Sequence, residues 1–80
     1  MNDRNKILIQ ILIVAEEYDI EIIKINFRNI TSILDMVEFT FKNEHEKFII
    51  KFSYEKDNMY DVNNVWRYIK NKLVELLMEE

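Results

Sequence analysis

The 80-residue sequence has no glycine, no proline and no cysteine, and it contains a single histidine, His45. Average usage would give about six glycines and four prolines in a chain of this length. Without glycine the chain cannot form a P-loop or a G-x-G-x-x-G dinucleotide site. Without cysteine, disulfides, thiolate nucleophiles and zinc knuckles are excluded as well.

The remaining route to catalysis is a hydroxyl nucleophile, and the sequence offers little to activate one. A catalytic serine or threonine needs a general base and an oxyanion hole, and His45 is the one histidine that could serve. The hydroxyl side chains in the chain are Thr31, Ser32, Thr40 and Ser53. A single histidine is also too few for a histidine-based metal site. We therefore expect a protein that is not an enzyme and that holds no metal or cofactor.

Composition places the chain among globular domains. Hydrophobic residues make up 49% and charged residues 32%, and no apolar run approaches the ~18 residues that cross a bilayer. We expect one compact α+β domain over residues 1–80. The apolar stretch near the N-terminus is followed by Glu16 and Glu17 where a signal peptide would have small residues before its cleavage site, so a cytoplasmic location is expected. The 13 Ile, 9 Asn and 8 Lys residues indicate an AT-rich genome.

Helical periodicity marks both ends of the chain. Apolar residues at 7, 8, 11, 12, 14, 15 and 18 follow one helical face, with Asn2, Asp3 or Asn5 available as the N-cap. A buried strand is the alternative for this segment, because residues 7–14 are apolar except for Gln10 and rich in β-branched isoleucine. A second helix is expected after Asp61 as its N-cap. Its apolar stripe is Val62, Val65, Trp66, Ile69, Leu73, Leu76 and Leu77.

Three segments between the helices alternate with a period of two, which is typical of strands buried on one face. The side chains expected to face the core are Ile23, Ile25 and Phe27, then Val37, Phe39 and Phe41, and finally Phe48, Ile50, Phe52 and Tyr54. A turn at residues 43–46 pairs Phe41 with Phe48 and sets Glu38 opposite Lys51, an attractive charge pair. The predicted fold is α-β-β-β-α, with a three-stranded antiparallel sheet and both helices packed on one face.

This topology divides the charges of the chain, whose net charge is −4. The start of the first strand lies beside the turn between the other two, so two acidic segments meet at one end of the sheet. We call this set the acidic end: Glu16, Glu17, Asp19, Glu21, Glu44 and Glu46. The solvent face of the sheet carries a basic set against one acid, Glu38. We call this set the basic face: Lys24, Arg28, Lys42, Lys47 and Lys51. Either set could also be ordinary solvated surface, since lysines commonly protect sheets from aggregation.

The order of the elements invites comparison with two families. Double-stranded-RNA-binding domains share it, but Asp57 and Asp61 stand where that family has a lysine cluster, and acids there would repel phosphates. The chain resembles the small phage-encoded anti-CRISPR proteins in its length, acidity, element order, hairpin and the passage Tyr18-Asp19-Ile20-Glu21 into the first strand. The resemblance implies an inhibitor of a host defence nuclease complex, acting in the cytoplasm of a prokaryotic cell. Its acidic side chains would occupy a groove meant for DNA.

Two other functions stay open. The basic face could bind nucleic acid, with an affinity that falls as salt rises. Alternatively, apolar side chains outside the core stripes could form a homo-oligomer or an antitoxin-like complex. These side chains are Ile9, Ile13, Val74 and Met78. Ile9 and Ile13 lie one helical turn apart on an otherwise polar side, so a homodimer would use them first.

Overall fold

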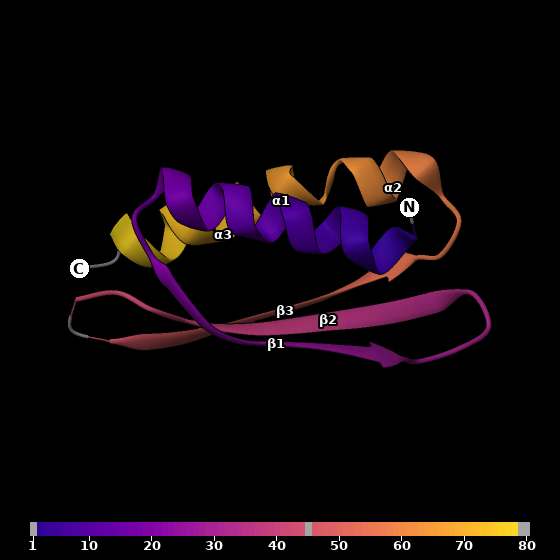
Figure 1. Cartoon of the computed structure of the whole chain (residues 1–80), viewed down its shortest axis with the longest axis horizontal. Helices are drawn as coiled ribbons and strands as arrows, with labels where there is room; N and C mark the ends of the chain where they lie inside the picture. The colour runs from indigo at the N-terminus through magenta and orange to yellow at the C-terminus, as the bar shows by residue number, and fades with distance from the viewer. Residues whose placement is uncertain (1, 45, 79–80) are drawn as a thin grey trace.

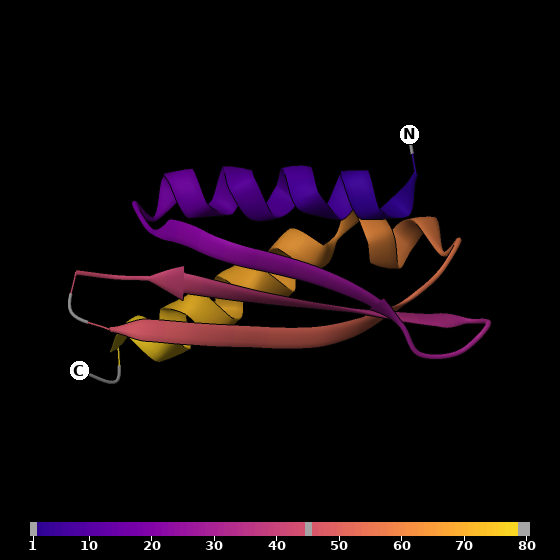
Figure 2. The ribbon, with the colours of Figure 1, turned by 60° about the horizontal axis from the view of Figure 1, so that its bottom comes forward.

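The helices of the chain cover one face of a three-stranded antiparallel sheet, as predicted (Figure 1). The computed structural model describes residues 2–44 and 46–78. The elements are α1 (Asp3–Glu17), β1 (Glu21–Asn29), β2 (Leu34–Lys42), β3 (Lys47–Glu55), α2 (Met59–Asn63) and α3 (Val65–Met78). The strand order is β1-β2-β3. α1 runs along the β1 side of the sheet, and α3 crosses diagonally behind β2 and β3 (Figure 2).

Residues 7–18 lie mainly in a helix, so the strand alternative for this segment is wrong. α1 begins at its N-cap Asn2, whose side chain accepts the backbone N–H of Asn5 at 2.9 Å. Ile7, Ile11 and Val14 recur at helical spacing and are fully or almost fully buried. After α1, Asp19 adopts a left-handed conformation with φ 54°. Glycine usually fills such positions, and aspartate tolerates them better than most other residues.

The hairpin of β2 and β3 has the predicted register. Phe41 lies opposite Phe48 and Glu38 opposite Lys51. The rings of Phe41 and Phe48 stack with their centroids 5.1 Å apart, and Lys51 Nζ lies 3.9 Å from a carboxylate oxygen of Glu38. The turn closes through a hydrogen bond that the Asn43 N–H donates to the Glu46 carbonyl at 2.9 Å.

In β1 the prediction that Ile23 faces the core is wrong. The pairing of β1 with β2 passes from Ile22 opposite Phe41 directly to Lys24 opposite Thr40. Ile23 is therefore the extra residue of a β-bulge, which shifts the alternation by one position. Ile22 faces the core in its place, while Ile23 is 47% exposed.

The last predicted helix is divided in two, and its N-cap is not Asp61. α2 starts three residues earlier, with Asn58 as its N-cap, whose side chain accepts the N–H of Asp61 at 3.2 Å. Asp61 thus lies in the first turn of α2, where its negative charge suits the helix dipole. The break falls at Asn64, and α3 continues from Val65.

Gln10 of α1 fills that break. Its Nε2 donates to the carbonyl of Val62 at 2.7 Å, and its Oε1 accepts the N–H of Trp66 at 3.0 Å. In a continuous α-helix the Trp66 N–H would donate directly to the Val62 carbonyl. One side-chain amide replaces this bond, so the single polar residue of the apolar run ties α1 to both later helices.

The core lies between the sheet and the helices. Its members are Ile7, Ile11, Val14, Val37, Phe39, Phe41, Ile50, Tyr54, Val62, Val65, Ile69 and Leu73. Phe48, Phe52 and Trp66 pack against this core but stay half-buried. Among the residues described, no helix is long and apolar enough to span a membrane.

Candidate functional site

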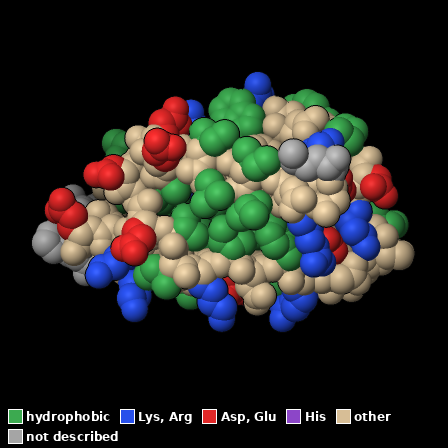
Figure 3. Space-filling view, viewed as in Figure 1, with side chains coloured by type: hydrophobic (Ala, Val, Ile, Leu, Met, Phe, Trp, Pro, Cys, Tyr) green, Lys and Arg blue, Asp and Glu red, His purple; other side chains and the backbone are tan. Residues whose placement is uncertain are grey.

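Three carboxylates of the acidic end lie around one cavity between the start of β1 and the hairpin turn. β1 starts at Glu21, directly opposite Lys42 at the end of β2. Asp19, Glu21 and Glu44 line one open cavity of about 400 Å³ together with Lys42. All six carboxylate side chains of the acidic end are exposed. Figure 3 shows acidic side chains spread over the left end of the molecule, where Figure 1 places the end of α1 and the hairpin.

Lysines limit the negative charge of this end. Lys70 of α3 lies 2.9 Å from a carboxylate oxygen of Glu17, and this hydrogen bond raises the pKa of Lys70 above its ordinary value. Lys42 and Lys47 lie opposite each other beside the hairpin turn. The acidic end and the basic face therefore meet at this turn. The sequence had predicted two separate surfaces.

Strand pairing places the basic face on the side of the sheet that the helices leave open. Strand pairing places Lys24 beside Thr40, Arg28 beside Met36 and Lys42 beside Lys47, all pointing away from the helices. Lys51 is held by Glu38. The other four basic side chains have no ion pair within 4.0 Å in the described part of the chain.

The expectation of one acid on this face is wrong, because Glu21 and Glu55 share it with Glu38. In an antiparallel pair, opposite residues point to the same side of the sheet. The side chain of Glu21 therefore points to the open face like that of its partner Lys42. The side chain of Glu55 points there like that of its partner Leu34. None of the paired strand residues on this face is aromatic, so the face offers no platform on which bases could stack.

A buried polar cluster around Asp35 was not predicted. Asp35 of β2 is only 4% exposed, and it accepts hydrogen bonds from Tyr54 Oη at 3.1 Å, Asn29 Nδ2 at 3.0 Å and Arg4 Nε at 3.3 Å. Lys56 Nζ lies 4.0 Å away. The signal was in the sequence, since position 35 continues the core-facing alternation of positions 37, 39 and 41.

Hydrogen bonding keeps Asp35 ionised. Burial by itself would raise its pKa, but the hydrogen bonds from Asn29, Tyr54 and Arg4, with the charge of Arg4, outweigh burial and lower the pKa below its ordinary 3.8. Burial and the nearby carboxylate raise the pKa of Tyr54 to about 12. The described residues include no buried side-chain polar atom without a hydrogen-bond partner. The cluster therefore anchors the start of α1 to the sheet.

The predicted apolar surface of α1 is exposed. Ile9 is 43% and Ile13 59% exposed, and Val74 and Met78 of α3 are exposed as well. Ile13 also borders a cavity of about 170 Å³ between α1 and α3, beside Trp66.

In the described part of the chain, no group of three or more His, Asp or Glu side chains is arranged to hold a metal ion. His45, interpreted from the sequence as a turn residue, lies outside the described residues. Comparisons of the chain with protein-family models, curated proteins and solved structures find no significant match. The function is therefore inferred from the surfaces themselves.

Proposed function

We propose that this chain is a non-enzymatic phage or mobile-element protein that binds and inhibits a host defence nuclease complex. The acidic end would occupy a basic groove of the target that otherwise holds nucleic acid. One observation supports this proposal above the others: exposed carboxylates from two separate segments meet where Asp19, Glu21 and Glu44 line one cavity.

The chemistry of this end suits such a groove. Carboxylates accept short, charge-assisted hydrogen bonds from arginine and lysine, which are the groups that bind phosphates. A cluster of one sign also attracts an oppositely charged channel over a distance, which raises the association rate and makes it sensitive to salt. Lys42 and Lys47 border the acids on one side. These lysines would repel a uniformly basic surface, so the groove of the target is expected to be basic opposite the carboxylates and not opposite Lys42 and Lys47.

Nucleic-acid binding by the basic face is the second candidate. The observation in its favour is that Lys24, Arg28, Lys42 and Lys47 have no ion pair among the described residues. Three acids, Glu21, Glu38 and Glu55, share the face with them. Together with the lack of aromatic side chains there, they make it the weaker candidate.

Two assays test the proposal. In cells whose type II CRISPR system targets a plasmid, expression of the chain is expected to restore transformation by that plasmid. Purified protein mixed with labelled single-stranded DNA or RNA is expected to show no anisotropy change at low salt. Binding of the free nucleic acid that weakens steeply with salt, together with unchanged plasmid interference, would favour the second candidate.

A further inference from the structure

The outer edge of β3 carries unpaired backbone groups. β3 is the last strand of the sheet, and Figure 2 shows no further strand beyond it. Toward β2, the Glu46 carbonyl accepts a hydrogen bond from Asn43, and the Lys56 N–H donates one to Ile33 at 2.7 Å. The backbone N–H and C=O groups of successive residues point alternately to the two sides of a strand. Residues 47, 49, 51, 53 and 55 therefore turn their N–H and C=O groups outward.

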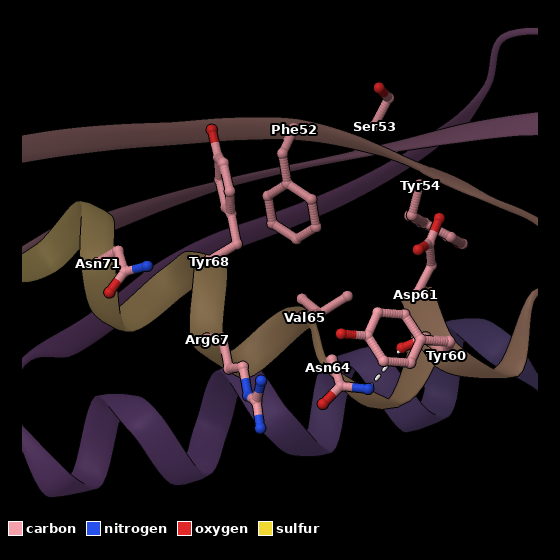
Figure 4. Close-up of a pocket in the computed structure, with 10 residues that line it drawn as sticks. All are labelled: Phe52, Ser53, Tyr54, Tyr60, Asp61, Asn64, Val65, Arg67, Tyr68 and Asn71. Carbon is pink, nitrogen blue, oxygen red and sulfur yellow. Dashed lines mark hydrogen bonds between the residues drawn. The ribbon is translucent and has the colours of Figure 1, made fainter.

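A groove runs beside this edge on the helix side. Two cavities of about 430 and 290 Å³ adjoin along β3 and share Tyr68 of α3. Figure 4 shows Phe52 of β3, Tyr60 of α2 and Tyr68 of α3 around the larger one. The rings of Phe52 and Tyr68 lie 5.0 Å apart, and Tyr60 and Leu76 supply further apolar surface. The groove explains why Phe52, although it faces inward, is only half-buried.

We propose that the β3 edge and its groove bind an extended, acidic segment of a partner protein, which adds to the sheet as a fourth strand. Outward N–H and C=O groups would pair with the backbone of the segment, and alternate side chains would enter the groove. At about 3.3 Å per residue, the stretch of β3 from Ile49 to Tyr54 that borders the groove matches a segment of about six residues.

The charges beside the edge favour acids in the segment. The charged side chains that line the two cavities are Lys51, Asp61, Arg67 and Lys72. On the open face of the same strand, Lys47 adds a positive charge and Glu55 a negative one, so positive side chains still outnumber negative ones along the edge. A second copy of this chain is the competing occupant: antiparallel pairing of β3 with itself, centred on Lys51, sets the two Lys51 side chains opposite each other but places Lys47 opposite Glu55. The test below distinguishes this dimer from a bound acidic segment.

The geometry also fixes which side chains of the segment are acidic. Residues that face each other in an antiparallel pair point to the same side of the sheet. The outward backbone groups of β3 belong to residues whose side chains lie on the open face, among them Ile49, Lys51 and Ser53. The residues of the segment that hydrogen-bond to β3 therefore carry the acids, and the intervening residues place apolar side chains in the groove.

The test uses the whole chain, isotope-labelled, and a capped synthetic peptide of about seven residues that alternates glutamate with valine or phenylalanine. Nuclear magnetic resonance titration is expected to move the amide protons of Ile49, Lys51 and Ser53 downfield and to slow their exchange with solvent. Peptide N-methylation at the glutamates is expected to weaken binding by about tenfold or more, because it removes the hydrogen bonds to β3. N-methylation at the apolar residues is expected to leave binding unchanged.

Matched protein variants separate this site from general charge attraction. Lys51→Glu with Lys72→Glu is expected to weaken peptide binding at least tenfold. Lys24→Glu with Arg28→Glu changes the net charge equally at the opposite edge and is expected to leave binding unchanged. The proposal is overturned if the three β3 amides do not respond, if both N-methylated peptides bind alike, or if light scattering shows dimers joined through β3. This surface is separate from the acidic end, so such a result leaves the proposed inhibition untouched.

Discussion

Gln10 is the side chain on which the arrangement of the three helices depends most directly. It bonds at once to the Val62 carbonyl and the Trp66 N–H, replacing the helical bond between them. In Gln10→Ala both backbone groups lose this partner in a partly buried place. An unsatisfied buried group costs about 1–3 kcal/mol. Two such groups cost about 2–6 kcal/mol, and the few tenths of a kcal/mol that alanine gains in helix propensity leave a predicted loss of about 1.5–5.5 kcal/mol.

That loss is a large share of the stability of a chain this small, for which about 4–12 kcal/mol is typical. Urea denaturation of wild type and variant, followed by circular dichroism, measures the difference as a shift of the midpoint at constant slope. Gln10→Glu keeps an acceptor for the Trp66 N–H but sets a carboxylate oxygen against the Val62 carbonyl oxygen, so it is also expected to be less stable than wild type.

Asn71→Ala, at an exposed position of α3, is the matched control and is expected to stay within about 0.5 kcal/mol of wild type. If Gln10→Ala were as stable as this control, the two hydrogen bonds of the Gln10 side chain would contribute nothing to the free energy of unfolding. The helix break would then need another cause, and the claim that Gln10 stabilises it would be refuted.

Three further predictions concern the core, the buried cluster and assembly. Replacement of Phe39, which is 1% exposed, by alanine is expected to lower the free energy of unfolding by about 3–5 kcal/mol. A melting temperature within about 2 °C of wild type would contradict this. Asp35 has a folded pKa below its ordinary 3.8, so its contribution is present above that pH and is lost as the pH falls through the folded pKa. Asp35→Asn should accordingly lower stability at neutral pH and flatten the acid limb of a stability profile, and an unchanged profile would oppose this. If a homodimer forms through Ile9 and Ile13, Ile9→Lys should reduce the mass measured by light scattering to that of a monomer. A wild-type protein that is monomeric at high concentration would exclude this contact.

The sequence was sufficient to predict the order of the strands and helices and the register of β2 and β3. Alternation with a period of two is a local signal, and the opposite charges of Glu38 and Lys51 select one pairing. The β-bulge in β1 was not predictable in this way. Ile22 and Ile23 are both apolar, so the sequence is compatible with either facing the core.

The helix break and the Asp35 cluster depend on contacts between distant parts of the chain. Gln10 lies 52 positions from Val62, and local helix propensity carries no information about that bond. Arg4 is 31 positions from Asp35, so its role could not be inferred from spacing. For the candidate site, topology was enough to predict that Asp19 and Glu21 lie beside Glu44 of the hairpin turn. The ion pair of Glu17 with Lys70 and the closeness of Lys42 and Lys47 required the packed structure.

The central claim is that the acidic end, and not the basic face, meets the target. Paired charge reversals in the plasmid-interference assay test this most directly, with each variant first checked for wild-type circular dichroism. Glu44→Lys with Glu46→Lys is expected to abolish inhibition. Glu55→Lys with Glu75→Lys, which changes the net charge equally elsewhere, and Lys47→Glu with Lys51→Glu are both expected to retain it. Loss of inhibition in the lysine pair, with full inhibition retained by the Glu44 and Glu46 pair, would contradict the account and assign the function to the basic face.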